Sequence, residues 1–203
     1  MPFDENTYIV WQTGRDDVLV IDPGLEPELI LEFLRERNLR PAAILNTHGH
    51  ADHIAGNAAM KDAYPDAPLI IGKNEAQLLT DPVANLSARF DFSIISPNAD
   101  QLVSEGDVVE AAGLRLEVLD IPGHSPGHVV FVHRDTPCRV FGGDVLFRGS
   151  VGRTDFPGGS MDQLTTGIQT KLFKLPADTV VYPGHGPVTT VGKEMGDNPF
   201  VSV

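Results

Sequence analysis

Apolar residues recur at two different periods along this chain, and the two periods predict a protein built from both strands and helices. Alternating or short continuous apolar runs predict strands at residues 7–12, 18–21, 42–45, 69–71, 107–110, 114–121, 129–133, 139–141 and 179–182. Spacings of three and four predict helices at residues 28–38, 54–64, 73–80 and 163–173. The order of strand block, helix, strand block, helix suggests two sheets packed face to face with helices outside.

Residues 81–101 carry two prolines, two asparagines and little periodicity. Long irregular segments in compact domains often serve as lids over a functional site. The segment is therefore a candidate lid, with an ordinary packed connection as the alternative.

Composition limits the possible partners. A chain of 203 residues with 41% hydrophobic residues can bury a sizeable core. Its formal net charge of −13 repels phosphate backbones and anionic membrane surfaces, which argues against nucleic acid and membrane partners. The lone Cys138 excludes an internal disulfide framework, and the first residues resemble no signal peptide, so we expect a soluble, cytoplasmic protein.

Three of the seven histidines lie within six positions, shortly after the predicted strand 42–45. If strand geometry continues, a period of two places His48, His50 and Asp52 on one side, and His53 comes from the turn into the next helix. Imidazole and carboxylate together suit zinc, iron or manganese. The run therefore predicts a metal site, in preference to a surface loop that happens to be rich in histidine.

Three further residues of ligand type, His124, Asp144 and His185, share one local setting. Each follows an apolar strand and sits among Gly or Pro residues, as His48 does. Strands that share a sheet end at the same rim, so loops that are distant in sequence can meet there. We therefore expect all four residues at one site.

Neighbouring polar residues have other interpretations. His128 begins the next strand and is expected to support a ligand through a hydrogen bond. His133 is expected at an exposed strand end. Asp22, which Pro and Gly follow, is locally a turn former. Cys138 is expected to be a small core residue.

These motifs, in this order, resemble those of the metallo-β-lactamase superfamily of hydrolases. They are Asp22, the run T-H-G-H-A-D-H at 47–53, His124, Asp144 and His185. The resemblance implies an α/β fold, the αββα sandwich of two mixed β-sheets with helices on the outer faces. It also implies two divalent transition-metal ions, zinc or, in its place, iron or manganese. The implied assignments are one ion at His48, His50 and His124, a second ion at Asp52, His53 and His185, Asp144 as a bridge, and Asp22 as a carboxylate that orients a ligand.

Within the superfamily, T-H-G-H-A-D-H-I-A-G-N, G-H-S-P-G-H and F-G-G-D-V-L-F look most like glyoxalase II, the hydroxyacylglutathione hydrolase. G-R-T-D-F-P-G-G and Y-P-G-H-G-P resemble its short bacterial branch. The longer enzymes carry a C-terminal helical extension that helps to hold glutathione, whereas only residues 186–203 follow His185 here. We therefore expect residues 1–203 to form a single domain without that extension, and S-D-lactoylglutathione to be hydrolysed with a high KM.

The expected chemistry depends on two ions about 3.5–4 Å apart, which can share a water, lower its pKa and polarise the carbonyl that it attacks. Asp52 is expected to orient the bridging hydroxide. A thiolate can leave without a strong general acid, which favours thioester hydrolysis. Arg148, Arg153 and Lys193 are candidate contacts for a substrate carboxylate, with solvated surface charge as the alternative.

Other functions fit the same residues. A persulfide dioxygenase of this superfamily keeps them but uses one iron, held by the equivalents of His48, His124 and Asp144. A lactonase or β-lactamase would use the same centre, although no feature of the sequence indicates a ring-specific pocket. A non-catalytic domain stabilised by metal is the third alternative, and the full ligand set weighs against it.

Overall fold

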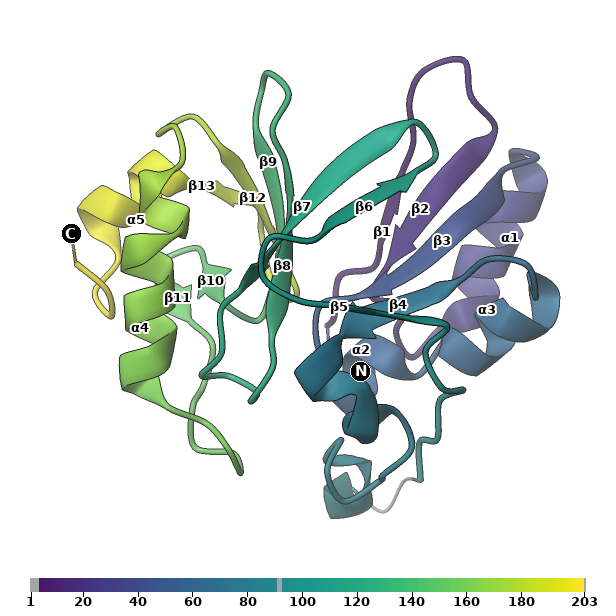
Figure 1. Ribbon diagram of the computed structural model, residues 1–203, viewed down its shortest axis with the longest axis horizontal. Helices are drawn as coiled ribbons and strands as arrows, with labels where there is room; N and C mark the ends of the chain where they lie inside the picture. The colour runs from purple at the N-terminus through teal and green to yellow at the C-terminus, as the bar shows by residue number, and fades with distance from the viewer. Residues whose placement is uncertain (1–3, 91–92, 203) are drawn as a thin grey trace.

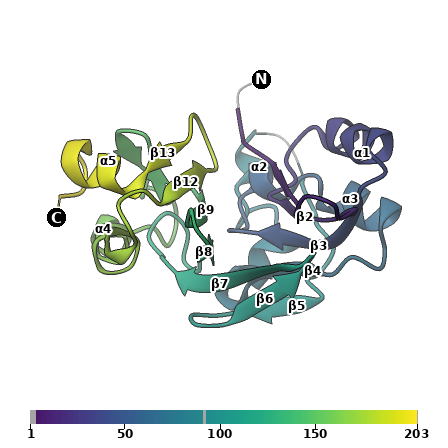
Figure 2. The ribbon, with the colours of Figure 1, turned by 90° about the horizontal axis from the view of Figure 1, so that it is seen from above.

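Two β-sheets pack face to face, and helices cover the outer face of each (Figure 1). The computed structural model describes residues 4–90 and 93–202. Helices α1 and α3 lie outside the first sheet, and α4 and α5 lie outside the second, as the view from above also shows (Figure 2). This arrangement confirms the predicted αββα sandwich of two mixed sheets.

The first sheet contains the N-terminal strands in chain order. They are β1 (Tyr8–Val10), β2 (Asp17–Ile21), β3 (Arg40–Asn46), β4 (Leu69–Gly72) and β5 (Gln101–Val103). β1 runs antiparallel to β2, and β2 to β5 run parallel to one another. The apolar run of β3 is buried on both faces, with Leu45 directed towards the second sheet and Ile44 towards the helices.

The second sheet has the strand order β13-β12-β9-β8-β7-β6. Its strands are β6 (Val108–Ala111), β7 (Leu114–Asp120), β8 (Val129–His133), β9 (Arg139–Gly143), β12 (Val180–Pro183) and β13 (Thr189–Thr190). β9 and β12 pair in parallel, and the other neighbours pair antiparallel. A short hairpin, β10 (Leu146–Phe147) with β11 (Ser150–Val151), follows β9.

Three layers of apolar side chains hold the sandwich together. The middle layer lies between the sheets and contains Leu45 and the fully buried Phe131. One outer layer joins the first sheet to α1 (Pro27–Glu36) and α3 (Asn57–Ala63), and the other joins the second sheet to α4 (Met161–Thr170) and α5 (Val191–Asp197). Cys138 belongs to the layer beside α4, as predicted.

The local sequence explains where several helices begin. α1 has a proline in its first turn, where the missing N–H is not needed. The side chain of Ser160 caps α4 by accepting a hydrogen bond from the backbone N–H of Gln163, and Thr190 caps α5 through Lys193 in the same way.

The helix predicted at 54–64 corresponds to α3, which starts later than predicted, and a separate short helix precedes it. α2 (Ala51–Ile54) ends before Gly56, and α3 begins after it. The backbone of Gly56 packs against Pro23, whose carbonyl accepts the Gly56 N–H at 2.8 Å. A side chain at this position would collide with the Pro23 and Gly24 carbonyls, so the chain bends here to meet the turn after β2.

Some predicted elements differ in type, and others were not predicted. Residues 73–80 form the 3₁₀ helix η1 (Lys73–Leu79) in place of an α-helix. The predicted lid segment contains η2 (Ser87–Phe90), and η3 (Leu172–Lys174) follows α4. The sequence pattern did not predict β5, β10, β11, β13 or α5, all of which are short. Across residues 4–90 and 93–202, no helix has both the length and the hydropathy that crossing a bilayer requires.

Candidate metal centre

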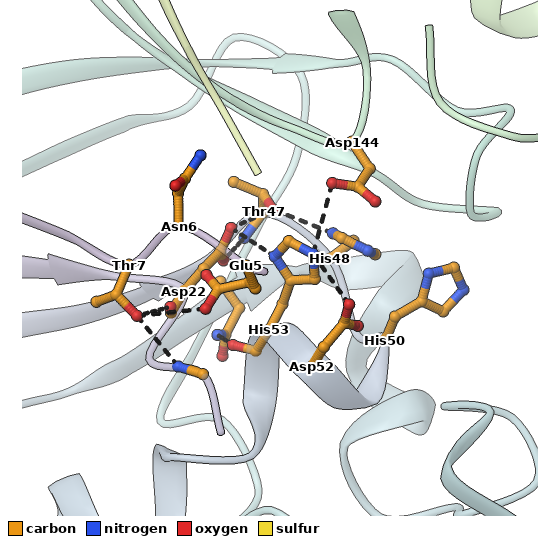
Figure 3. Close-up of polar contacts among 12 residues, drawn as sticks. Glu5, Asn6, Thr7, Asp22, Thr47, His48, His50, Asp52, His53 and Asp144 are labelled. Carbon is orange, nitrogen blue, oxygen red and sulfur yellow. Dashed lines mark hydrogen bonds and ion pairs between the residues drawn. The ribbon is translucent and has the colours of Figure 1, made fainter. Parts of the chain in front are cut away.

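The predicted ligand residues come together at one end of the sandwich, between the two sheets. His48 and His50 lie in the loop after β3, and Asp52 and His53 lie in α2. β3 ends at Asn46, so strand geometry does not continue through the histidine run; the loop and the first turn of α2 bring these side chains together instead. Figure 3 shows Asp144 reaching the same place from the opposite sheet.

The second sheet supplies the remaining predicted ligands from loops at its strand ends. His124 lies in the loop between β7 and β8, Asp144 directly follows β9, and His185 lies two residues after β12. The loops of one sheet thus face the histidine run of the other. The site exists only where both sheets meet.

One group of three side chains consists of His48, His50 and His124, which offer ligand atoms within 4.8 Å of one another. The Nδ1 of His50 lies 2.9 Å from the Nε2 of His124. The Nδ1–H of His124 donates to the Arg153 carbonyl at 2.8 Å, so its Nε2 carries the lone pair that faces the group. Three imidazole nitrogens therefore point at one place.

A second group consists of Asp52, His53 and His185. The Oδ2 of Asp52 lies 3.3 Å from the Nε2 of His185 and 3.9 Å from the Nε2 of His53. The Nδ1 of His53 contacts Asp22 Oδ2 at 3.1 Å, and the Nδ1–H of His185 donates to the Asp4 carbonyl at 3.0 Å. Both rings therefore present Nε2 to the group.

Asp144 lies between the two groups. Its Oδ1 is 3.5 Å from the Nε2 of His53, and its Oδ2 is 3.4 Å from the Nε2 of His124 and 3.6 Å from the Nε2 of His185. One carboxylate thus reaches ligand atoms of both groups, which is the placement that a bridge between two ions requires.

The spacing of these atoms fits metal ligation. Zinc ligands lie about 2.0–2.2 Å from the ion, so neighbouring ligand atoms of a tetrahedral site are separated by about 3.3–3.6 Å. Within the described part of the chain, His48 Nε2, His53 Nε2 and Asp144 Oδ1 are buried and have no hydrogen-bond partner. Leaving each such atom unpaired costs about 1–3 kcal/mol. The site therefore fits bound cations better than it fits a network of protein hydrogen bonds.

The electrostatics of the site favour neutral rings at His48 and His50 and a positive charge beside the carboxylates. Burial lowers the pKa of His48 well below its usual value, and burial together with His124 lowers the pKa of His50 to about 3. Burial also acts to lower the pKa of His53, but Asp52 and Asp144 outweigh it and raise that pKa well above its usual value. The carboxylates thus create a place where a cation is stabilised.

Two of the predicted supporting residues contact the ligands directly. Asp22 accepts hydrogen bonds from the backbone N–H and the hydroxyl of Thr47, each at 2.7 Å, while it contacts His53. His128 accepts the backbone N–H of Asp144 at 3.0 Å, and its ring stacks on His48 with centroids 4.6 Å apart. Asp22 thus orients His53, and His128 fixes the start of the Asp144 loop.

Sequence reasoning missed Glu75, a fully buried carboxylate in η1. Its two oxygens accept the backbone N–H of Gly49 at 2.7 Å and that of Gly127 at 2.6 Å. Gly49 lies between His48 and His50, and Gly127 precedes His128, so Glu75 joins the histidine loops of the two sheets. No sequence motif marks this glutamate, because its partners are backbone amides distant in sequence.

Glycines allow the close approach of backbone that the site needs. A side chain at Gly143, which has a φ of +46°, would collide with Thr47 and His128. A side chain at Gly184 would collide with Asp144 and His53. The two glycines therefore let β9 and β12 bring Asp144 and His185 up to the first sheet.

A pocket of about 480 Å³ opens above the ligand groups. The residues that form its polar floor are His50, Asp52, His124, Asp144 and His185. The apolar side chains that form its walls are Leu25, Leu86, Phe90, Ile94, Phe147, Val151 and Phe156. Residues 91 and 92 of the predicted lid segment 81–101 lie outside the described residues, and the described part supplies Leu86, Phe90 and Ile94 to one wall. That the segment acts as a lid stays a prediction.

The three basic residues considered as substrate contacts have different positions. Arg153 lines the pocket, pairs with Asp155 through two hydrogen bonds and lies 4.2 Å above the Phe156 ring. Arg148 donates to the Val188 carbonyl and is not among the pocket-lining residues of the described chain. Lys193 pairs with Asp197 on the surface of α5 at 3.3 Å.

A family model of the metallo-beta-lactamase superfamily matches residues 1–185, a range that includes every predicted ligand. The chain belongs to this superfamily. The chain is 35% identical over 207 residues to the hydroxyacylglutathione hydrolase GloC of Haemophilus influenzae. The alignment covers 98% of this chain and 94% of GloC.

Solved structures of the superfamily share the same fold. The crystal structure of the BLEG-1 B3 metallo-beta-lactamase superposes with a TM-score of 0.94 at 36% identity and covers 100% of this chain and 97% of its own. The crystal structure of TTHA1623 in a di-iron-bound form has a TM-score of 0.85 at 40% identity. This match covers 99% of this chain and 97% of the TTHA1623 chain. The chain is thus similar to superfamily members along nearly its whole length.

Replacement of Glu75 by Gln tests whether this carboxylate joins the two histidine loops. Gln keeps the size but directs an NH₂ group at one backbone N–H, so one hydrogen bond is lost and the free energy of unfolding should fall by about 1–3 kcal/mol. Urea denaturation measures the change, and Glu32→Gln on the exposed surface of α1 is the control. Equal denaturation midpoints for the two variants would show that the loops are held by other contacts.

Proposed function

We propose that this chain is a dinuclear metallohydrolase that cleaves thioesters of the S-D-lactoylglutathione type. The observation that carries the proposal is the pair of ligand groups beneath an apolar pocket, with Asp144 3.4–3.6 Å from nitrogens of both groups. His48 Nε2, His53 Nε2 and Asp144 Oδ1 are buried there without a hydrogen-bond partner. Residues 1–203 act in this proposal as one metallo-β-lactamase domain. The name of the Haemophilus relative adds support for a hydroxyacyl thioester as the substrate.

In the proposed assignment, one ion is held by His48, His50 and His124 and the other by Asp52, His53 and His185, with Asp144 between them. When bound, two such ions lower the pKa of water towards neutrality and polarise a carbonyl oxygen. Zinc, iron and manganese all suit this mixture of imidazole and carboxylate. The di-iron form of TTHA1623 is consistent with iron as one of the candidates.

Asp52 has a second role in the proposal, as the residue that orients the attacking water. Burial acts to raise its pKa, but His53 and His185 outweigh burial and hold that pKa below its usual value, so the carboxylate stays ionised. An ionised carboxylate at the pocket floor can accept a hydrogen bond from water and direct a lone pair at the substrate.

The pocket walls favour a thioester over substrates with poorer leaving groups. Phe156 lies edge-on to His50, with ring centroids 5.5 Å apart, and Phe147 lies edge-on to His185 at 6.3 Å. These rings exclude water and provide an apolar surface for sulfur and an acyl chain. The histidines of the floor are committed to ligation in this assignment, so none is left to protonate an amine. A thiolate needs no such proton.

We further propose that Arg153 contacts a carboxylate of the substrate. Its guanidinium lies over Phe156 at the pocket wall, and that of Arg89 lies on the same ring at 5.5 Å. Asp155 already pairs with Arg153 through two hydrogen bonds, so a substrate carboxylate would share this guanidinium with Asp155 or displace it. Arg148 is a weaker candidate because the Val188 carbonyl already engages it.

β-Lactam hydrolysis is a second candidate, because the fold is that of BLEG-1 with a TM-score of 0.94. A β-lactam nitrogen is a poor leaving group unless it is protonated, and the proposed site offers no spare acid. We therefore expect β-lactam turnover to be the slower reaction.

Replacement of Asp144 by Ala should empty both metal positions, because this carboxylate approaches His53, His124 and His185 together. Elemental analysis of dialysed protein measures the metal content. Asp135→Ala, at an exposed carboxylate, and His133→Ala at the end of β8 should leave the content unchanged. If Asp144→Ala retains the metal content and turnover of the parent protein, the assignment of Asp144 as a bridge is wrong.

A panel of substrates tests the proposed activity on one metal-loaded preparation. S-D-lactoylglutathione, a thioester without glutathione, a lactone, a β-lactam and glutathione persulfide would be assayed side by side, the last by oxygen uptake. We expect the two thioesters to have the highest kcat/KM, with a high KM for lactoylglutathione. Oxygen uptake on persulfide without thioester cleavage would replace the proposal with a mononuclear-iron dioxygenase. No detectable turnover of any of the five substrates would favour a non-catalytic, metal-stabilised domain.

A further inference from the structure

His185 differs from the other predicted ligands in how it is held. The side chain of His185 is 28% exposed to solvent, whereas that of His53 is fully buried and that of His124 is 3% exposed. It lies between Gly184 and Gly186, and Gly186 has a φ of +72°, so its own loop gives little restraint. Something outside the loop must fix the ring if it is to ligate a metal.

The Gly184 N–H donates to the Gly143 carbonyl at 2.7 Å, and further contacts that fix this loop come from the N-terminal segment 4–8, here called the N-terminal clamp. Glu5 forms an isolated antiparallel bridge with His185, and the backbone N–H of Asn6 donates to the Gly184 carbonyl at 2.7 Å. The Asp4 carbonyl accepts the Nδ1–H of His185. The clamp therefore sets both the position of the His185 backbone and the direction of its ring.

Two side chains of the clamp strengthen this attachment. The amide of Asn6 donates to the carbonyls of Pro183 at 3.1 Å and Gly186 at 2.8 Å, one on each side of His185. The hydroxyl of Tyr8 donates to the Pro183 carbonyl at 2.7 Å. A single amide thus holds the loop at both ends.

The clamp also reaches the support of a second ligand. The hydroxyl of Thr7 donates to the Asp22 carbonyl at 2.8 Å and accepts the backbone N–H of Gly24 at 3.2 Å. Asp22 in turn contacts His53. Among the hydrogen bonds of residues 4–90 and 93–202, none joins the clamp to His48, His50 or His124. Asp22 also reaches His48, one contact further away, through the Thr47 hydroxyl. The direct contacts of the clamp are to the loop of His185, so its influence is greatest on the group formed by Asp52, His53 and His185.

We propose that the N-terminal clamp, through Asn6 above all, is a positioning element that sets the affinity of the second metal position and leaves the first largely unaffected. This inference rests on the dinuclear assignment of the proposed function. Partners that orient a metal-ligating histidine through its other ring nitrogen, or that fix its loop, determine how well the ligand is preorganised. Asn6 is a positioning residue and touches neither ion nor substrate.

Asn6→Ala tests the inference through metal binding, independently of activity. The metal-loaded full chain would be titrated with a zinc chelator, which gives two successive dissociation constants. We expect one of the two constants to rise about 10- to 100-fold, in line with losses at other supporting residues, while the other stays at its parent value. Tyr8→Phe, which keeps the ring packing on Tyr182 and Phe141, should act in the same direction with a smaller effect.

Gln12→Ala is the matched control. Gln12 follows the same strand β1, and its amide donates to the Gly113 carbonyl of the second sheet at 2.9 Å, away from the metal centre. Gln12→Ala removes a side-chain hydrogen bond between the first and second sheets, as Asn6→Ala does. Both zinc dissociation constants should remain unchanged in Gln12→Ala.

The outcomes separate the clamp from the dinuclear assignment. Two ions bound by Asn6→Ala with parent affinities would overturn the role of the clamp alone. Equal weakening of both positions, or an equal change in Gln12→Ala, would also overturn it, because the effect would then be one of general stability. A single ion per parent chain would remove the second position and overturn both proposals. Manganese-loaded protein adds a readout by electron paramagnetic resonance. Loss of one ion converts the spectrum of a magnetically coupled Mn²⁺ pair into that of an isolated Mn²⁺.

Discussion

The structure depends on one constraint: imidazole and carboxylate groups are buried together without enough protein partners to satisfy them. Among the described residues, the Nε2 atoms of His48 and His53 and the Oδ1 of Asp144 lie in the interior with no hydrogen bond. Such atoms destabilise a fold unless something else interacts with them. Bound cations satisfy them all at once, and the carboxylates then repel one another less. Metal binding in this account is therefore also a source of stability.

The same constraint explains why both sheets are needed. The first sheet supplies the histidine run, and the second supplies His124, Asp144 and His185 at its strand ends. Bonds to backbone amides and carbonyls join the two sets: Glu75 spans the Gly49 and Gly127 loops, while Asn6 holds the loop of His185. The apolar layers bring the sheets together, and these hydrogen bonds fix the positions of the loops that carry the candidate ligands.

The fold, and the convergence of the candidate ligand residues at one place, could be predicted from the sequence for a physical reason. Apolar runs marked the long strands, and Gly or Pro beside His124, Asp144 and His185 marked loops at their ends. Short elements such as β13 and α5 gave no periodicity to detect. The helix break at Gly56 depends on packing against Pro23, and Glu75 acts through backbone amides, so neither leaves a local sequence signal. Tertiary contacts decide such features.

The central claim is that two cations lie side by side between the sheets with Asp144 between them. Crystals of protein grown in zinc-containing medium, measured on both sides of the zinc absorption edge, test it most directly. The account predicts two anomalous peaks per chain, one beside His48, His50 and His124 and the other beside Asp52, His53 and His185. A single peak, or none, in fully loaded crystals would contradict it.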